Sequence, residues 1–455
     1  MMRIMEQRKL RFDSVLLPTG WARDVCVSVD AGGLISNIET TSQEGRQVSG
    51  ITVPGMANLH SHAHQRLMQG LAERAGPGAD SFWTWREAMY GFALKLSPED
   101  MEAVTAQAYS EMLCAGFTAV GEFQYLHHQP DGSPYDNRAE MSLRCLAAAE
   151  TTGIATTMLP VLYSHGGFGG AEPNAGQRRF VNDVDGFLDI YEILNNALDG
   201  QHQLGVGPHS LRAVTKAGLD AVLEATPQGQ PVHVHVAEQI KEVEDCLAWS
   251  KQRPVEYLLS HFDVNQNWCA IHATHMEEHE ARVLATSGAV AGLCPTTEAN
   301  LGDGIFPAVE FIKAGGKFGI GSDSHITISP AEDLRLLEYL QRMKHNTRNA
   351  LADGAGLSTG RSVFDRALKG GAQALQQNMG VIEIGKRADF VVLNDDHHAL
   401  LGRAEDAALD AWIFSGGNNC VRDVYAGGKL QVRDGVHLNA ASITNNFKKT
   451  LTRLI

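Results

Sequence analysis

Eight short runs of β-type residues, separated by stretches with helical spacing, most constrain the fold of this sequence. The runs begin at Ile51, Gly116, Gly153, His202, Pro231, Trp268, Ala289 and Lys317. The stretch SPEDMEAVTAQAYSEMLCAG, for example, opens with a Ser-Pro helix-start signal at Ser97 and stops at Gly116. Alternating strands and helices predict a parallel α/β sheet, and eight such units predict a (β/α)8 barrel of the TIM type.

Both ends of the chain carry further β-type runs outside this alternation. VCVSVDAGGLISNI, from Val25, holds two alternating runs around a DAGG turn and predicts a hairpin. From Gly385 onward, GKRADFVVLN and VRDVYAGGKLQVRDG carry strand runs and an AGG turn. Segments this short do not fold alone, so we expect them to pair in one small β-sandwich lobe. The expected division is 1–54 and 376–455 for the lobe and 55–375 for the barrel.

Composition excludes several classes of protein. The chain has 455 residues, 44% of them hydrophobic, which is enough for a sizeable core. It has no run of eighteen apolar residues, and its start, MMRIMEQRKLRFD, lacks the apolar region of a secretory signal. Seven scattered cysteines without a CxxC pair read as reduced thiols, and a net charge of −15 argues against a nucleic-acid surface. We therefore expect a cytoplasmic protein that binds neither membrane nor nucleic acid.

Polar side chains collect at the C-terminal ends of the runs, where barrels of this type build their active sites. In NLHSHAHQ, His60 and His62 are two positions apart, so on a strand they face the same side and can bind one metal ion. An isolated pair of this kind is more often a surface or hydrogen-bonded pair. Here His235 ends the fifth run, His272 the sixth and Asp323 the eighth. Imidazoles and one carboxylate around an open position are typical of a catalytic metal site.

These motifs resemble the amidohydrolase superfamily, and the HxHxxE arrangement of HVHVAE resembles its deaminase branch. The resemblance implies one divalent metal ion, usually zinc, although iron and manganese also occupy such sites. The implied metal ligands are His60, His62, His235 and Asp323. The implied catalytic residues are Glu238, His272 and Asp323. Glu238, which would otherwise read as a solvated loop residue, lies where a carboxyl can move a proton from water to a leaving nitrogen.

The resemblance leaves three points open. His64, the third histidine of the opening motif, stands where the narrower family that the longer strings below resemble usually has Phe, and it packs under the substrate more plausibly than it binds a second metal. His233 should face the same side as His235, and its role is open. Barrels of this superfamily are often homodimers, and the sequence does not fix the oligomeric state.

Longer strings resemble one family within the superfamily, the N-formimino-L-glutamate deiminases of histidine degradation. They include SFWTWREAMY, EFQYLHH, YSHGGFGG, HSLRAVT, HVAEQIKEVEDCLAWS, GLCPTTEANLGDGIFP and GSDSHITISP, in the expected order along essentially the whole chain. The resemblance implies metal-dependent hydrolysis of N-formimino-L-glutamate to N-formyl-L-glutamate and ammonia.

Charge gives an independent argument for a dicarboxylate substrate. In a chain of net charge −15, two substrate carboxylates need local cations, and the forked guanidinium of arginine suits them best. Arg86 follows WTW after the first run, and Arg212 closes HSLR after the fourth. By resemblance the substrate is held by Gln65, Arg86, Tyr125, His209 and Arg212. The alternative without a binding role is that the two arginines are surface charges and Tyr125 is an aromatic residue of the core.

Two other interpretations compete with this one. A nucleobase or S-adenosylhomocysteine-type deaminase shares the metal site but favours aromatic stacking and amide groups over two arginines. A catalytically inactive barrel that serves as a scaffold predicts lost metal ligands, and no ligand of the motif is lost here.

Overall fold

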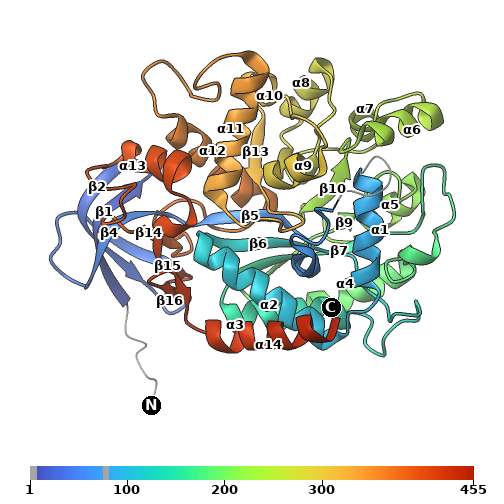
Figure 1. Cartoon of the computed structure of the whole chain (residues 1–455), viewed down its shortest axis with the longest axis horizontal. Coiled ribbons are helices and arrows are strands. Elements are labelled where there is room, and N and C mark those ends of the chain that lie inside the picture. The colour runs from blue at the N-terminus through green and yellow to red at the C-terminus, as the bar shows by residue number, and fades with distance from the viewer. Residues whose placement is uncertain (1–7, 75–80, 455) are drawn as a thin grey trace.

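The computed structural model describes residues 8–74 and 81–454, and it forms a TIM-barrel-like α/β body with a β lobe at one side (Figure 1). The strands of the body are β5 (Met56–Ser61), β6 (Phe117–Gln124), β7 (Ala155–Leu162), β8 (Gln203–Leu204), β9 (Gly207–Pro208), β10 (Val232–Val236), β11 (Trp268–His272), β12 (Val290–Leu293) and β13 (Lys317–Ile320). The predicted alternation of strands and helices is confirmed, with the fourth run divided between β8 and β9.

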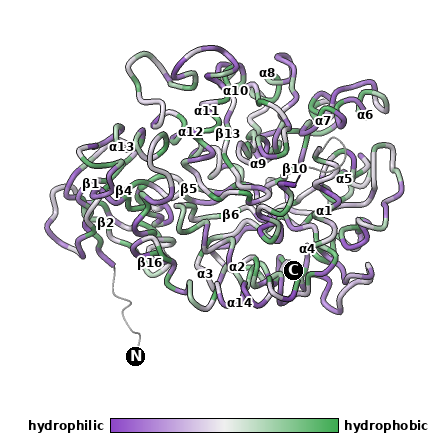
Figure 2. The backbone as a smooth tube through the Cα atoms, viewed as in Figure 1, coloured by the Kyte–Doolittle hydropathy of each residue, from purple (hydrophilic) through white to green (hydrophobic). Residues whose placement is uncertain are grey.

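Helices follow or connect these strands. They are α1 (Phe82–Ala93), α2 (Pro98–Ala115), α3 (Glu140–Thr152), α4 (Val184–Ala197), α5 (Lys216–Ala225), α6 (Ile240–Ser250), α7 (Pro254–His261), α8 (Glu278–Ser287), α9 (Pro295–Leu301), α10 (Ala308–Lys313), α11 (Pro330–His345), α12 (Thr359–Leu375), α13 (Asp406–Ala411) and α14 (Ala440–Leu454). As predicted, α2 begins after Ser97, whose side chain accepts from the Asp100 amide, and it ends at left-handed Gly116. Peripheral helices such as α6 and α8 carry both hydrophilic and hydrophobic segments (Figure 2).

The strands of the body form two parallel sheets rather than one continuous ladder. One sheet has the order β5-β6-β7-β8, with β9 paired to β7, and the other has the order β10-β11-β12-β13. Within the described residues, isolated parallel bridges join the two sheets at both seams. Val206 pairs with Val232 and Ser210 with His235 at one seam, while Ser61 pairs with Asp323 at the other. The eight-unit architecture is therefore TIM-barrel-like, with ladders interrupted at the two seams.

The lobe is built from both ends of the chain, as predicted. Its strands are β1 (Arg8–Leu17), β2 (Gly20–Val29), β3 (Ile35–Glu39), β4 (Arg46–Pro54), β14 (Phe390–Leu393), β15 (Val421–Ala426), β16 (Lys429–Arg433) and β17 (Val436–His437). The hairpins predicted at DAGG and AGG are β2–β3 and β15–β16. N-terminal β4 pairs antiparallel with C-terminal β14, so hydrogen bonds connect all these strands in one sheet.

Two features of the structure differ from the sequence interpretation: the start of the first barrel strand and the end of the chain. The run from Ile51 is divided, because its first part belongs to β4 in the lobe and the barrel strand β5 starts only at Met56. The break falls at Gly55, where a Cβ atom would lie 2.3 Å from Thr118 Oγ1. The C-terminal segment, expected to be β structure, ends in helix α14, which lies against α2 (Figure 1). There, Thr450 Oγ1 donates to the Asp100 carboxylate.

Candidate active site

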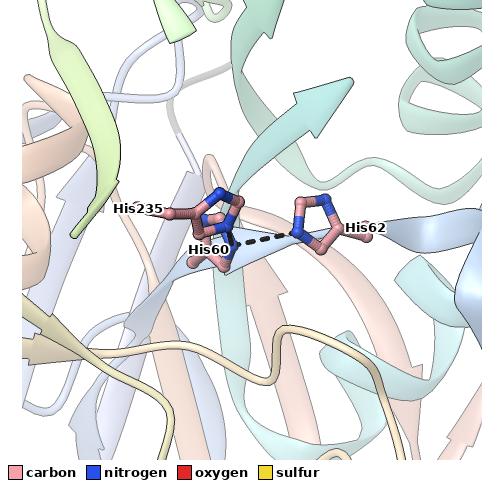
Figure 3. Close-up of side chains that lie close together, drawn as sticks. All are labelled: His60, His62 and His235. Carbon is pink, nitrogen blue, oxygen red and sulfur yellow. Dashed lines mark hydrogen bonds between the residues drawn. The ribbon is translucent and has the colours of Figure 1, made fainter. Parts of the chain in front are cut away.

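Three histidine side chains meet at the C-terminal ends of β5 and β10. His60 and His62 come from β5 and the residue after it, and His235 comes from β10. The Nε2 atom of His60 lies 3.2 Å from that of His62 and 3.0 Å from that of His235 (Figure 3). A tetrahedral zinc ion with Zn–N bonds of about 2.0–2.1 Å holds its nitrogen ligands about 3.3 Å apart. Both distances are close to this spacing, and one ligand atom of each of the three histidines lies within 4.8 Å of the others, as a shared ion requires.

The hydrogen bonds of the Nδ1 atoms, which point away from the cluster, show that the Nε2 atoms are free to bind an ion. His62 Nδ1 lies 2.9 Å from the Phe123 carbonyl oxygen, and His235 Nδ1 lies 2.9 Å from the His209 carbonyl oxygen. A carbonyl only accepts, so both Nδ1 atoms carry the proton and both Nε2 atoms present a lone pair. Burial lowers the pKa of His60 to about 3, so this ring is neutral as well. One N–H cannot satisfy both contacts of His60, and a cation among the Nε2 atoms fits this donor set.

Asp323 brings a carboxylate to the same cluster. It follows β13, and its Oδ1 atom lies 3.5 Å from His60 Nε2 and 3.4 Å from His62 Nε2. Gly321 allows this approach, since a Cβ atom there would lie 2.8 Å from the Cβ of His60. His60 and His62 belong to one sheet of the body, and His235 and Asp323 to the other. An ion bound by these four side chains would link the two sheets.

Glu238 and His272 lie beside the cluster. His272 Nε2 is 3.8 Å from Glu238 Oε1 and 3.7 Å from Asp323 Oδ2. Burial raises the pKa of Glu238 to about 7. Burial alone would lower the pKa of His272, but the surrounding carboxylates, Glu238 first, raise it to about 10. Acidic and basic groups with perturbed pKa values, packed together at strand ends, can exchange protons with a bound molecule.

The backbone around these residues adopts an unusual conformation. Positive φ angles occur at Ala237 (52°), His272 (67°), Ala273 (48°), Asp323 (45°) and His325 (59°). For residues other than glycine, such angles cost on the order of 1–3 kcal/mol each, and they cluster where function requires a particular side-chain direction. The backbone strain at these strand ends therefore lowers the stability of the fold, and it sets the directions of the side chains.

A cavity opens above the cluster and contains two unpaired guanidinium groups. Its free volume is about 60 Å³, and its lining includes Arg86 from α1 and Arg212 from the segment after β9. The Nε atoms of both arginines are buried and have no hydrogen-bond partner among residues 8–74 and 81–454. Neither arginine forms an ion pair with these residues. The Trp83 ring lies under both groups, with its centroid 4.4 Å from Arg86 Cζ and 5.8 Å from Arg212 Cζ. Two cations without an anion make this a site for a negatively charged ligand.

The other three residues expected to hold the substrate line the same cavity. Gln65 donates through Nε2 to the Tyr125 hydroxyl at 2.8 Å, and its buried Oε1 has no hydrogen-bond partner among the described residues. The His209 ring lies 6.0 Å from the Tyr125 ring and 4.9 Å from that of His235. The candidate substrate-binding residues thus line one cavity together with Glu238, His272 and three of the four metal-ligand candidates, His62, His235 and Asp323.

A sequence-family model described as the amidohydrolase family matches residues 51–431 of this chain. The chain belongs to the amidohydrolase family. Members of this family use a divalent metal, and the three-histidine cluster supplies a candidate binding group for one.

Relatives of this amidohydrolase are found among curated proteins and solved structures. The formimidoylglutamate deiminase of Pseudomonas aeruginosa is 48% identical over 446 residues, which cover 97% of this chain and 98% of the relative. A 5-methylthioadenosine/S-adenosylhomocysteine deaminase of Natronomonas pharaonis is 27% identical over 84% of this chain and 82% of the relative. The crystal structure of an amidohydrolase from Brucella melitensis superposes with a TM-score of 0.93, at 51% identity over 98% of this chain and all of that one.

His64 of the amidohydrolase stands apart from the three-histidine cluster. Its Nε2 atom lies 3.0 Å from the Tyr125 hydroxyl, and the two rings meet edge to face with centroids 4.9 Å apart. The Tyr125 hydroxyl also approaches Met89 Sδ at 3.5 Å. The third imidazole of the opening motif thus supports the cavity wall by a hydrogen bond to Tyr125. An aromatic hydrocarbon ring at this position would support it by packing alone.

His233 occupies the opposite end of the barrel interior. It faces the same side of β10 as His235 but lies two residues earlier, about 7 Å down the strand. Its Nε2 atom lies 2.8 Å from the Ala374 carbonyl oxygen near the end of α12. The strand-parity argument placed His233 on the interior side correctly, and its hydrogen bond to α12 gives it a structural role.

The sequence analysis missed two buried carboxylates that support the site. Glu122, on β6, accepts from Ser61 Oγ at 2.6 Å and from the Ala63 amide at 2.9 Å, so it holds the backbone that carries His60 and His62. Glu298, on α9, lies 3.2 Å from the outer nitrogen of His272. Glu298 falls within the signature GLCPTTEANLGDGIFP, but nothing in the sequence shows which residue it contacts.

Proposed function

We propose that this amidohydrolase hydrolyses N-formimino-L-glutamate to N-formyl-L-glutamate and ammonia. The observation that carries the proposal is that the guanidinium groups of Arg86 and Arg212 share a cavity with the histidine cluster and have no ion-pair partner in the part of the chain that the structure describes. The substrate has two carboxylates for these cations and an imine carbon to be attacked below them. Identity of 48% to a formimidoylglutamate deiminase over 97% of the chain supports the same conclusion.

The proposal assigns the chemistry to residues 55–375 and a supporting role to the terminal segments 1–54 and 376–455. One divalent ion, most simply zinc, would be held by His60, His62, His235 and Asp323. Once bound, the ion activates water as a nucleophile. The water oxygen adds to the imine carbon, both protons of that water pass to the terminal nitrogen, and the bond from the carbon to this nitrogen breaks as the carbon–oxygen bond becomes the formyl carbonyl, releasing ammonia.

The side chains around the cluster would manage the protons. Glu238 accepts a proton from the attacking water and delivers it to the leaving nitrogen, for which its raised pKa suits it. His272 directs Nε2 toward the same place, and Asp323 lies within 3.7 Å of that nitrogen. Gln65, Tyr125 and His209 line the cavity and would orient the substrate, with Arg86 and Arg212 neutralising its two carboxylates.

An ammonia-release assay tests this function against its alternatives. Purified protein is given N-formimino-L-glutamate, guanine, adenosine or S-adenosylhomocysteine at equal concentrations. We expect rapid ammonia release from N-formimino-L-glutamate alone. Preferential turnover of a purine substrate would replace the proposal with a deaminase function, and no turnover of any of them would leave the scaffold interpretation.

The metal site predicts a stoichiometry and an effect on stability. Elemental analysis should find about one divalent ion per chain, and His60→Ala should lose it while the control His64→Phe keeps it. Binding at a free concentration 100 times the Kd stabilises a fold by about 2.7 kcal/mol. Dialysis against a chelator should therefore lower the melting temperature, and re-addition of zinc should restore it. A chain that purifies without metal and retains full turnover would contradict the assignment.

A further inference from the structure

The outer nitrogen of His272 has a specific partner. His272 ends β11 and points Nε2 into the cavity, toward Glu238 and Asp323. On the other side of the ring, Nδ1 lies 3.2 Å from Glu298 Oε1. Both side chains are buried, with 1% of His272 and 3% of Glu298 exposed. This contact is thus removed from solvent, where a charge-assisted hydrogen bond has its greatest effect.

Glu298 is itself held in place. It lies on α9, and its backbone amide donates to the Cys294 carbonyl at 2.9 Å. Its Oε1 atom also accepts from the Cys294 amide at 2.9 Å. The same carboxylate oxygen therefore receives a backbone N–H and faces the imidazole, which leaves it little freedom to turn away from His272.

We propose that Glu298 is a positioning residue for His272 in the reaction proposed above, on which this inference rests. A carboxylate oxygen accepts, so the proton of the ring stays on Nδ1 in both its neutral and its charged form. The proton that His272 exchanges is then the one on Nε2, the nitrogen that faces the reacting centre. Glu298 also fixes the plane of the ring, which keeps Nε2 directed at the reacting centre.

The variant Glu298→Gln tests this role. The uncharged amide either keeps its oxygen on the Cys294 N–H and offers Nδ1 a weaker acceptor, or turns its N–H₂ to Nδ1 and favours the tautomer with the proton on Nε2. We expect kcat for N-formimino-L-glutamate to fall about 10- to 100-fold, the usual effect of losing such a supporting group. KM, metal content and melting temperature should stay near their wild-type values. A matched control is Asp333→Asn. Asp333 is a buried carboxylate on α11 that accepts from Thr296, which lies on α9 as Glu298 does, and it has no contact with His272 among the described hydrogen bonds. The control should keep most of its kcat.

A double-mutant cycle distinguishes positioning from general support of the fold. If Glu298 acts through His272, Glu298→Gln should change kcat less than about threefold in a His272→Asn background, since coupled residues are not additive. Equal losses in both backgrounds, or an equal loss in Asp333→Asn, would overturn the inference.

Nitrogen chemical shifts of labelled histidine report the His272 tautomer without substrate. We expect a protonated, strongly hydrogen-bonded Nδ1 in the wild type and a clear change of its chemical shift in Glu298→Gln. Identical shifts in the two proteins would refute the positioning role. Failure of the wild type to hydrolyse N-formimino-L-glutamate would refute the proposed function instead, while the chemical shifts would still decide how Glu298 acts on the ring.

Discussion

Glu238→Gln is expected to lower kcat for N-formimino-L-glutamate by roughly 10²–10⁴-fold, the range typical for loss of a positioned general acid–base group. Glutamine has nearly the shape of glutamate, but its amide cannot accept a proton from water and return it to the leaving nitrogen. The Glu238 carboxyl is buried and lies 3.8 Å from His272 Nε2, so no solvent group replaces it directly. Steady-state kinetics on metal-loaded protein measure the effect.

Two controls accompany the Glu238→Gln variant. Its metal content should match the wild type, because the ion is expected on His60, His62, His235 and Asp323, whereas Glu238 belongs to a separate buried group with His272 and Asp303. Glu244→Gln removes an exposed carboxylate from α6, six residues further along, and should leave kcat unchanged. Turnover close to that of the wild type in the metal-loaded Glu238 variant would mean that another group moves the proton.

Arg212→Ala and Arg86→Ala should each weaken use of the dicarboxylate substrate by on the order of 2–5 kcal/mol in kcat/KM, the cost of leaving a partly buried anion without its partner. Neither guanidinium is committed elsewhere, because each has a buried Nε atom without a partner among the described residues. Arg282→Ala, which removes an exposed arginine paired with Glu278 on α8, is the matched control.

The comparison substrate decides what the arginines do. A formimino compound that lacks both carboxylates has no anion to lose, so its residual kcat/KM should change much less in Arg212→Ala and Arg86→Ala. Equal losses on the charged and the uncharged substrate would show that the two residues support the cavity wall rather than recognise the substrate.

Local signals in the sequence predict the repeating units of this fold. The alternation of runs, the Ser97 cap of α2 and the glycine-rich turns of the two lobe hairpins depend on neighbouring residues, and all are present in the structure. Helix α14 was missed because it is stabilised by packing against α2 and by bonds to Asp100, which is more than 300 residues away in sequence. The seams between the sheets depend on such distant pairings as well.

Part of the candidate site could be predicted from the sequence because the strand ends of such a barrel converge. Each polar residue at a strand end could therefore be placed without knowledge of its neighbours in space. The supporting contacts were not readable in this way. The Glu298–His272 and Glu122–Ser61 pairs join separate elements, and side-chain direction within a helix or strand does not show which distant group is met. His233 shows the same limit, since strand parity gave its side but not its depth in the barrel.

The division of the four metal-ligand candidates between two sheets has a consequence for synthesis of the chain. His60 and His62 leave the ribosome first, His235 follows, and Asp323 emerges last. At about 5–20 residues per second, tens of seconds pass between the first and the last of them. A chain that has not yet reached Asp323 therefore has only the histidines of this site, and strand β4 still lacks its partner β14. Assembly of all four candidate ligands and pairing of β4 with β14 are for this reason late events in synthesis of the chain.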